Sequence, residues 1–319
     1  MKSLPDAPRP GRWETLPPLE TPRSHPAVTV HDGKIYVIGG GGPNFQSLDS
    51  VEIYDPSEGI WRLGIPMPTR RSGAAAITIH GKILVIGGGY KKPDGKFVFL
   101  RTVEIFDPAA GAWKTGPDLL MPHDYPASVR LGDFIYILGG HHPDATEGGP
   151  QTDPGLDFCE RLAVSQDRGP VGGWQEIAPL PAPRFAVSAA TVEGWIWATG
   201  GVAFTGQGLT EYDAVDLYDP TAGVWTREPE LSLPWPSAAH GIAILDKGVY
   251  LFGGFSTDWI HTRCAVYDPA EKSWSALPPH HKPRAAMGIA ALDDAIYLIG
   301  GWERDGRTVM NDVTAYYPR

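Results

Sequence analysis

Six glycine doublets recur along the chain at nearly even spacing, and each follows a tryptophan at an almost constant distance. The interval from tryptophan to the first glycine is 26 residues in five cases, and Trp225 precedes Gly253 by 28 residues. A period of about 50 residues built from short strands is typical of propeller blades. The doublets are Gly39-Gly40, Gly87-Gly88, Gly139-Gly140, Gly200-Gly201, Gly253-Gly254 and Gly300-Gly301. Because blades close into a ring, function is expected at the central funnel.

The length of 319 residues fits one closed ring, because each blade shares a core with both of its neighbours. We therefore expect a single domain over residues 1–319, with residues 1–11 as a loose tail. Glycine and proline, 39 and 32 residues, fall between apolar runs such as Ile35–Ile38. In that position they predict turns rather than disorder.

The charge balance limits the partners. A formal net charge of -10 disfavours nucleic acid and anionic membranes. Cys159 and Cys264 fall in the third and fifth repeats, which do not touch in a ring of six, so a disulfide is not expected and a reducing compartment fits. No segment has the apolar length of a signal peptide or a membrane span. The expectation is a cytoplasmic monomer.

Each repeat contains a short, strongly apolar run that ends at its glycine doublet. Runs of this length and composition predict buried strands, and the doublet permits positive φ or close backbone approach. The runs are Ile35–Ile38, Ile83–Ile86, Ile135–Leu138, Trp195–Thr199, Val249–Phe252 and Ile296–Ile299. A small-residue strand precedes each run, for example Ala74–Ile79.

An aromatic-Asp-Pro triplet closes the third strand of most repeats, and the tryptophan follows seven residues after its aromatic residue. Proline favours a tight turn that aspartate can cap, so a hairpin leads to a fourth strand. The triplets begin at Tyr54, Phe106, Tyr218 and Tyr267. The third repeat lacks the triplet and carries a long segment, His141–Phe158. Trp197 replaces the usual tyrosine, and the last repeat reads Tyr316-Tyr317-Pro318.

Doublet, triplet and tryptophan together resemble the kelch repeat over essentially the whole chain. The resemblance implies an all-β, six-bladed kelch β-propeller with four antiparallel strands in each blade. Within this family, propellers serve as interaction modules and as enzymes, so the resemblance leaves the function open.

The last repeat ends before its tryptophan strand, so another part of the chain must supply that strand. The segment from Trp13 to Leu19 matches the tryptophan strands of the other repeats. We therefore expect the N-terminal strand around Trp13 to complete the C-terminal blade and remove an exposed edge. Deleting residues through Leu19 should then unfold or oligomerise the protein.

Counting back 16 residues from each first glycine gives a set rich in arginine: Arg23, Arg71, His123, Arg184, Ser237 and Arg284. Arginines on one loop face would form a cationic ring that binds carboxylates or phosphates in two-pronged geometry. The alternative is structural, with each arginine paired to a carboxylate such as Asp49, Glu52 or Glu104. Both interpretations are open at this point.

Two residues further on lie His25 and Tyr125, beside small residues in the other repeats. Polar groups next to such space are candidate proton donors or acceptors, although hydrogen bonding within the strand edge is the alternative. The candidate catalytic residues are His25, His123, Tyr125, His141 and Glu303. The candidate ligand-binding residues are the arginines Arg23, Arg71, Arg184 and Arg284, with Tyr90, Trp235, Phe255, Trp259 and Trp302.

No cofactor is predicted. Adjacent His141 and His142, followed by Asp144 and Glu147, could ligate a divalent metal, but their spacing is not diagnostic and a solvated loop is favoured. The iron motif of plant specifier proteins and the cysteine-linked tyrosine of galactose-oxidase-like enzymes are not evident. Phosphate-binding Gly-x-x-x-x-Gly-Lys and Gly-x-Ser-x-Gly sequences do not occur either.

These observations favour a stand-alone propeller that binds an anionic, carboxylate-bearing small molecule or an acidic peptide in an arginine-lined central funnel. The alternative is an enzyme that acts on an acidic sugar or small carboxylate by acid–base catalysis, as an epimerase or lyase, with metal assistance a remoter option. The resemblance to bacterial six-bladed kelch sialic-acid epimerases implies this enzymatic alternative. Those enzymes are exported, and the missing leader counts against the analogy.

Overall fold

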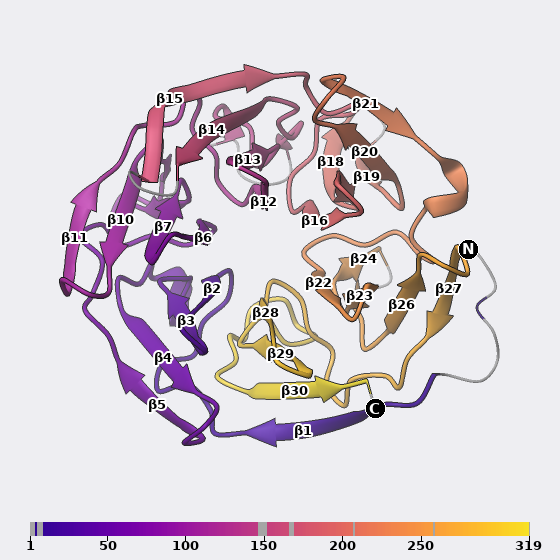
Figure 1. Ribbon diagram of the computed structural model, residues 1–319, viewed down its shortest axis with the longest axis horizontal. Helices are drawn as coiled ribbons and strands as arrows, with labels where there is room; N and C mark the ends of the chain where they lie inside the picture. The colour runs from indigo at the N-terminus through magenta and orange to yellow at the C-terminus, as the bar shows by residue number, and fades with distance from the viewer. Residues whose placement is uncertain are drawn as a thin grey trace.

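The computed structural model describes residue 4 and residues 9–145, 152–165, 169–206, 208–257 and 259–318. Within these residues, six four-stranded antiparallel sheets follow one another around a ring (Figure 1). Each sheet is one blade, and its first strand lies nearest the axis. The prediction of an all-β, six-bladed propeller is confirmed.

In the first three blades the strands follow chain order from axis to rim. The first is β2 (Ala27–His31), β3 (Lys34–Ile38), β4 (Val51–Asp55) and β5 (Ile60–Leu63). The second is β6 (Ala75–Ile79), β7 (Lys82–Ile86), β10 (Val103–Asp107) and β11 (Ala112–Thr115). The third is β12 (Ala127–Leu131), β13 (Phe134–Leu138), β14 (Cys159–Ser165) and β15 (Gly169–Ile177).

The other three blades repeat this order. The fourth is β16 (Ser188–Val192), β17 (Trp195–Thr199), β20 (Val215–Asp219) and β21 (Val224–Arg227). The fifth is β22 (Gly241–Leu245), β23 (Gly248–Phe252), β26 (Cys264–Asp268) and β27 (Ser273–Ala276). The sixth is β28 (Gly288–Leu292), β29 (Ala295–Ile299), β30 (Val313–Tyr317) and β1 (Arg12–Leu16), so it combines both ends of the chain.

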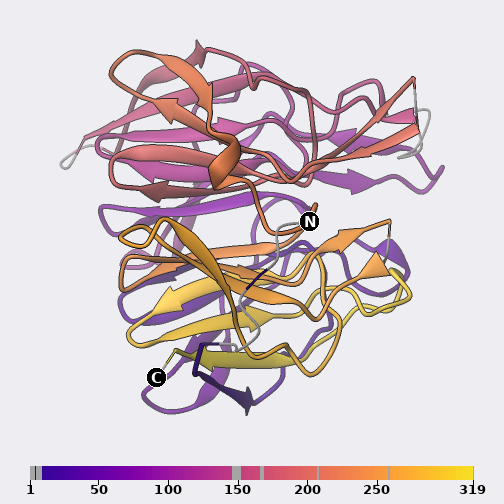
Figure 2. The ribbon, with the colours of Figure 1, turned by 90° about the vertical axis from the view of Figure 1, so that its right-hand side faces the viewer.

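Short hairpins follow three of the glycine doublets. They are β8 (Gly89–Lys91) with β9 (Phe97–Phe99), β18 (Val202–Thr205) with β19 (Gly208–Glu211), and β24 (Phe255–Ser256) with β25 (Trp259–Ile260). Short 3-10 turns lie at Pro43–Phe45 and Pro229–Leu231. The hairpins extend from the same side of the ring, the loop face (Figure 2). The segment after each doublet therefore determines which side chains lie above the axis on this face.

The hydrophobic core lies between neighbouring blades. Ile79 and Leu84 of the second blade pack with Ile135 and Ile137 of the third, and all four are buried. The predicted apolar strands are therefore buried on both faces, which explains why they lack an alternating polar pattern. Each blade depends on its neighbours for its core.

The glycine doublets close the gap between blades. Gly39 has a φ of 59°, and a Cβ there would lie 2.6 Å from the carbonyl oxygen of Arg71 in the next blade. The N–H of Gly40 donates to that same oxygen at 2.9 Å. Both the close approach and the positive φ require glycine.

The aspartate of each aromatic-Asp-Pro triplet caps its turn, as predicted. Asp55 Oδ1 accepts from the N–H of Ser57 at 3.1 Å, and Asp219 Oδ1 accepts from the N–H of Thr221 at 2.7 Å. These side-chain hydrogen bonds stabilise the hairpin before the outermost strand.

Strand β1 pairs antiparallel with β30 and places Trp13 opposite Tyr316. The residues before it are not all loose, because the N–H of Arg9 donates to the carbonyl of Ala276 at 2.8 Å and its guanidinium pairs with Asp268 and Glu271. This contact differs from the expected loose tail over residues 1–11. The N-terminal segment therefore contacts both the fifth and the sixth blade.

The repeat tryptophans link each blade to the one before it. The indole N–H of Trp61 donates to the carbonyl of Pro17 at 2.8 Å, and that of Trp13 donates to Pro278 at 3.1 Å. The other four make the same kind of bond: Trp113 to Ile65, Trp174 to Pro117, Trp225 to Ala178 and Trp274 to Leu231. The constant tryptophan spacing thus corresponds to a contact that runs around the whole ring.

Cys159 and Cys264 are buried and free, in the third and fifth blades. Across the described part of the chain, no helix has the length and apolar character needed to span a membrane.

Candidate functional site

The predicted arginine ring does not line the funnel. Arg23, Arg71, Arg184 and Arg284 are at most 1 % exposed, and each guanidinium points into its own blade. Arg23 pairs with Glu52 and donates to the carbonyl of Gly39 at 2.9 Å; Arg71 pairs with Glu104 at 3.0 Å; Arg184 pairs with Asp216. Arg284 donates to the carbonyls of Leu298 and Asp312, each at 3.1 Å. The structural alternative therefore describes these arginines, because three of them are paired with a buried carboxylate and Arg284 is held by backbone carbonyls.

The two residues that replace arginine at this position, His123 and Ser237, also make contacts within their own blades. His123 is fully buried, with Nε2 3.1 Å from Glu160 and Nδ1 2.6 Å from the carbonyl oxygen of Gly139. Ser237 donates to the carbonyl of Gly253 at 3.3 Å, and Ala265 occupies the strand position that holds a carboxylate in four other blades. His123 therefore does not face a ligand, contrary to its selection as a catalytic candidate.

The backbone carbonyl of the residue at the arginine position of each blade also connects neighbouring blades. The second glycine of each doublet donates its N–H to the equivalent residue in the next blade: Gly40 to Arg71, Gly88 to His123, Gly140 to Arg184, Gly201 to Ser237, Gly254 to Arg284 and Gly301 to Arg23. Burial lowers the pKa of Arg284 to about 10. We call this position the interblade clamp, since its side chain binds its own blade and its carbonyl binds the preceding one.

The residue after the clamp pairs with the residue after the doublet in every blade. These two-residue bridges are Ser24 with Gly41, Ser72 with Gly89, Asp124 with His141, Phe185 with Val202, Ala238 with Phe255, and Ala285 with Trp302. The first two blades thus present small groups, the third presents an acid and an imidazole, and the other three present apolar side chains. The loop face therefore differs chemically from blade to blade.

A cavity of about 370 Å³ opens on this face, and we refer to it as the loop-face cavity. Its volume lies within the range of small-molecule sites. Its aromatic lining consists of Phe45, Phe97, Phe99, Phe185, Phe255 and Trp302. Its polar lining consists of Ser24, His25, Ser72, Asp124, Tyr125, His141 and Asp153. None of the clamp arginines belongs to it.

The floor of the cavity is a belt of backbone around the axis. The six equivalent residues His25, Gly73, Tyr125, Ala186, Ala239 and Ala286 all have positive φ, between 48° and 64°. Five hydrogen bonds run around this belt: His25 to Ala286, Ala286 to Ala239, Ala239 to Ala186, Tyr125 to Gly73 and Gly73 to His25. Left-handed φ is costly for histidine and tyrosine, so the belt imposes this conformation on them.

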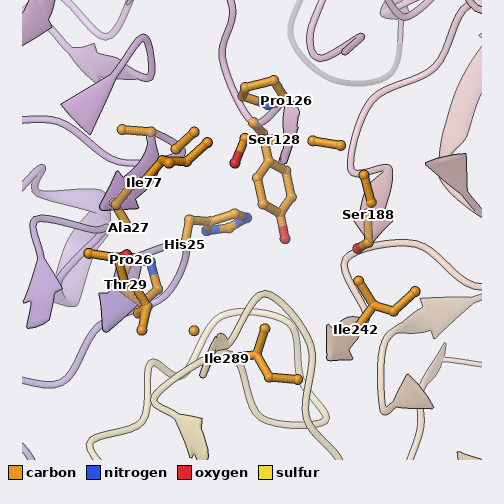
Figure 3. A pocket seen from close by; sticks show the side chains of 18 of the residues that line it. His25, Pro26, Ala27, Thr29, Ile77, Pro126, Ser128, Ser188, Ile242 and Ile289 are labelled. Atoms are coloured by element: carbon orange, nitrogen blue, oxygen red, sulfur yellow. The ribbon is translucent and has the colours of Figure 1, made fainter. Parts of the chain in front are cut away.

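A second cavity, the central channel, continues on the other side of the belt and holds about 480 Å³. The innermost strands line it with small and aliphatic residues such as Thr29, Ile77, Ser188 and Ile242 (Figure 3). The side chain of His25 points into this space (Figure 3). His25 lines both cavities, so it lies at their boundary.

His25 is held between two rings. Its imidazole makes edge contacts with Tyr125 and Trp302 at centroid distances of 4.4 Å each, and Nδ1 lies 3.1 Å from the Ser24 hydroxyl. Burial lowers the pKa of His25 to about 3. The imidazole is therefore neutral near pH 7.

His141 and Asp153 form a hydrogen-bonded dyad. The Nδ1 of His141 donates to Asp153 Oδ2 at 2.5 Å, and Asp153 is fully buried. The other oxygen of Asp153 accepts from the N–H groups of His142 at 3.1 Å and Gly155 at 2.8 Å. The His141 ring stacks on Phe185 at 4.3 Å. The dyad is thus fixed by hydrogen bonds on one side and by an aromatic face on the other.

Asp124 is the second acid of the cavity. A Cβ at Gly73 would lie 2.5 Å from Asp124 Oδ1, so the glycine makes room for this carboxyl group. Burial raises the pKa of Asp124 to about 6, with the nearby His141 opposing the shift. Burial also raises the pKa of the Tyr125 hydroxyl, which therefore stays protonated.

The remaining predicted residues divide between the cavity and other places. Phe255 and Trp302 line the cavity, as His25, Tyr125 and His141 do. The others lie outside its lining. Tyr90 is on β8, Trp235 is buried under Arg263, Trp259 is 66 % exposed on a hairpin, and Glu303 is exposed.

The structure does not support the metal site considered at His141 and His142. Among the described residues, no group of three or more histidine, cysteine, aspartate or glutamate side chains is arranged to hold an ion. His141 is bonded to Asp153, and His142 lies 3.6 Å from Asp144. Glu147, which the sequence placed in the same set, lies outside the described residues.

Sequence reasoning missed Asp124 and Asp153, as well as Phe45, Phe97, Phe99 and Phe185. Asp124 stands between His123 and Tyr125, and an alignment at one residue after the clamp would have revealed the series Ser, Ser, Asp, Phe, Ala, Ala. Asp153 lies in the long segment of the third repeat, where no other blade offers an equivalent. No repeat-based signal could have identified it.

Known proteins share the repeat and the fold. The family model of the Kelch motif matches residues 22–68 and 70–120. Kelch repeat and BTB domain-containing protein 12 of Danio rerio is 26 % identical over 58 % of this chain, and Beta-scruin of Limulus polyphemus is 28 % identical over 77 %. These alignments span 31 % and 26 % of the two relatives, so the chain corresponds to under a third of either protein.

A solved structure extends the likeness to the whole ring. The chain superimposes on the structure titled "Structure of YjhT" with a TM-score of 0.77 and 16 % identity, covering 94 % of this chain and 96 % of the other. At this identity the match establishes the fold alone. With the motif matches, the relatives and six blades in view, the chain is a kelch-repeat β-propeller.

Proposed function

We propose that this propeller binds a small molecule in the loop-face cavity, with a flat apolar body against the aromatic wall and a neutral polar end at Asp124 and His141. The supporting observation is the asymmetry of the cavity. Its six aromatic side chains come from five of the blades, whereas the His141–Asp153 dyad and Asp124 all belong to the third repeat. Few, fixed polar groups within an apolar enclosure are typical of small-molecule sites.

The charge of the cavity argues against the anionic ligand that the sequence suggested. The ionisable side chains of its lining are Asp124, Asp153, Tyr125 and the two histidines, while the four clamp arginines are buried outside it. A carboxylate ligand would lie next to Asp124 without a guanidinium to bind it. A neutral acceptor fits better, since the buried Nε1 of Trp302 has no hydrogen-bond partner among the described residues.

Thermal-shift measurements with three ligands that share a naphthyl group and differ in the charge of their polar end test this proposal. 2-Naphthylacetamide carries a neutral end, 2-(2-naphthyl)ethylamine a cationic end and 2-naphthylacetate an anionic end. We expect the amide to raise the melting temperature most and the carboxylate least.

Ser72→Phe fills the cavity and should abolish the shift, whereas Thr221→Phe, on an exposed turn of the fourth blade, should leave it unchanged. Equal shifts in wild type and Ser72→Phe, or a larger shift with the carboxylate than with the amide, would contradict the proposal.

A protein partner is the second candidate, because two large apolar side chains stand exposed on the loop face. Phe45 is 51 % exposed and Trp259 is 66 % exposed. Aromatic side chains of this kind often anchor protein interfaces. Trp259→Ser should weaken capture of such a partner and leave naphthylacetamide binding intact, because Trp259 lies outside the cavity lining.

A further inference from the structure

We propose that the loop-face cavity is a catalytic site for proton transfer, in which His141 is the general base, Asp124 the general acid and Asp153 a positioning residue. The substrate class is an aromatic ketone with an enolisable C–H group, and the reaction is its keto–enol isomerisation. This inference rests on the proposed function, because the substrate must first bind in the cavity.

The dyad gives His141 the correct tautomer for a base. Since Nδ1 donates its hydrogen to Asp153, the neutral imidazole leaves Nε2 with a free lone pair. None of the described residues forms a hydrogen bond with Nε2. A carboxylate that orients an imidazole in this way also stabilises the cation formed when the base takes a proton.

The position of the imidazole is fixed before any ligand arrives. Its ring lies between Phe185, at 4.3 Å, and Phe99, at 5.8 Å, in stacked orientation. Asp153 in turn is fixed by two backbone N–H groups. A general base held by two layers of contacts loses little freedom on substrate binding, which favours the transfer step.

Asp124 stands beside His141, as the strand partner of that residue. Its carboxyl group has no side-chain hydrogen bond within the described part of the chain, so it is available to a ligand. The raised pKa keeps part of this carboxyl protonated near neutral pH, as an acid catalyst requires. Acid and base thus lie next to each other on one wall of the cavity.

The proton balance closes without a further reactant. His141 Nε2 takes a proton from the carbon next to the carbonyl, and the C–H electrons form the carbon–carbon double bond of the enol. The carbonyl π electrons move to oxygen, which takes the proton of Asp124. The reverse steps regenerate the ketone and both side chains.

Hydrogen–deuterium exchange provides the test. We would incubate the full chain with 1-(2-naphthyl)propan-2-one in D2O and follow loss of its CH2 signal by proton NMR. The wild type should accelerate this exchange with saturation. His141→Gln should slow the catalysed rate about 100-fold or more, and Asp124→Asn and Asp153→Asn by roughly 10-fold or more.

Two controls separate chemistry from structure. His142→Gln changes the neighbouring imidazole, which lies outside the cavity lining, and should retain wild-type exchange. In ¹⁵N-labelled protein, Asp153→Asn should shift the tautomer signals of His141, a change that altered stability alone would not produce.

Binding is measured separately with 2-naphthylacetamide in each variant. If the amide binds to the wild type and the ketone exchanges no faster than in buffer, the catalytic inference is wrong and the binding proposal stands. The catalytic inference is also wrong if His141→Gln exchanges the ketone at the wild-type rate. If the amide does not bind, the proposed function itself fails.

Discussion

At the scale of single residues, the clamp position shows how one side chain can be mistaken for a ligand contact. Arg23 lies on the loop face in sequence, but its guanidinium turns inward to Glu52 and to the carbonyl of Gly39. The pair is fully buried, so removing one partner leaves the other charge without compensation. The clamp arginines therefore stabilise the blade rather than a ligand.

We expect Arg23→Ala to lower the free energy of unfolding by about 3–5 kcal/mol. Chemical denaturation measures this change, and binding of 2-naphthylacetamide to the folded variant should persist. The matched control is Arg62→Ala, which breaks an exposed pair with Glu58 and should cost less than about 1 kcal/mol. If Arg23→Ala is as stable as the wild type but no longer binds the amide, Arg23 contributes to ligand binding and the structural interpretation is wrong.

At the scale of strands, the tryptophans and the glycine doublets define the interfaces between blades. The indole of each outermost strand donates to a carbonyl that follows the outermost strand of the preceding blade, as Trp61 does with Pro17. The doublet makes the corresponding connection near the axis, through its N–H and a clamp carbonyl. Each interface is thus joined by hydrogen bonds at the rim and near the axis, with an apolar core between them.

Trp61→Phe tests the rim contact with little loss of apolar surface. We expect a loss of about 1 kcal/mol in the free energy of unfolding, the typical contribution of one hydrogen bond, as measured by urea denaturation. Trp195→Phe, at a partly exposed position of β17, should change stability by less. Equal losses in the two variants would show that the indole N–H of Trp61 contributes nothing specific.

The repeats allowed the blades to be predicted, because every blade must satisfy the same strand, turn and interface contacts. The site was less predictable. Counting residues from the doublet identifies Arg23. The loop after the doublet varies in length, so the count does not identify the carboxylate that pairs with it, and Glu52 was one of three possible partners. His25 and Tyr125 were found because they occupy equivalent positions before a doublet, and His141 because it directly follows one. Asp153 was not, because its loop exists in one blade.

At the scale of the whole molecule, the ring of blades is closed although the two ends of the chain are not covalently joined. Strand β1 pairs with β30 in the same manner as β5 pairs with β4, and Trp13 makes the contact that every other blade makes. The ends of that pair, Arg12 and Tyr317, are direct partners in register. In the ring, the sixth blade differs from the others mainly in where its backbone is interrupted.

The closure by β1 therefore makes the order of blades along the chain interchangeable. A circular permutant that joins Tyr317 to Arg12 through a two-residue turn, and begins at Gly223 and ends at Ala222, would close the fourth blade instead of the sixth. We expect its melting temperature to lie within a few degrees of wild type and its naphthylacetamide binding to be unchanged. Failure of the permutant to fold would mean that the ring needs the deleted segment, including the Arg9 contacts with Asp268 and Glu271, or the native position of its chain ends. Success would mean that the outer hairpin of the fourth blade can be opened, and so offers a place to attach a further domain, without disturbing the cavity on the axis.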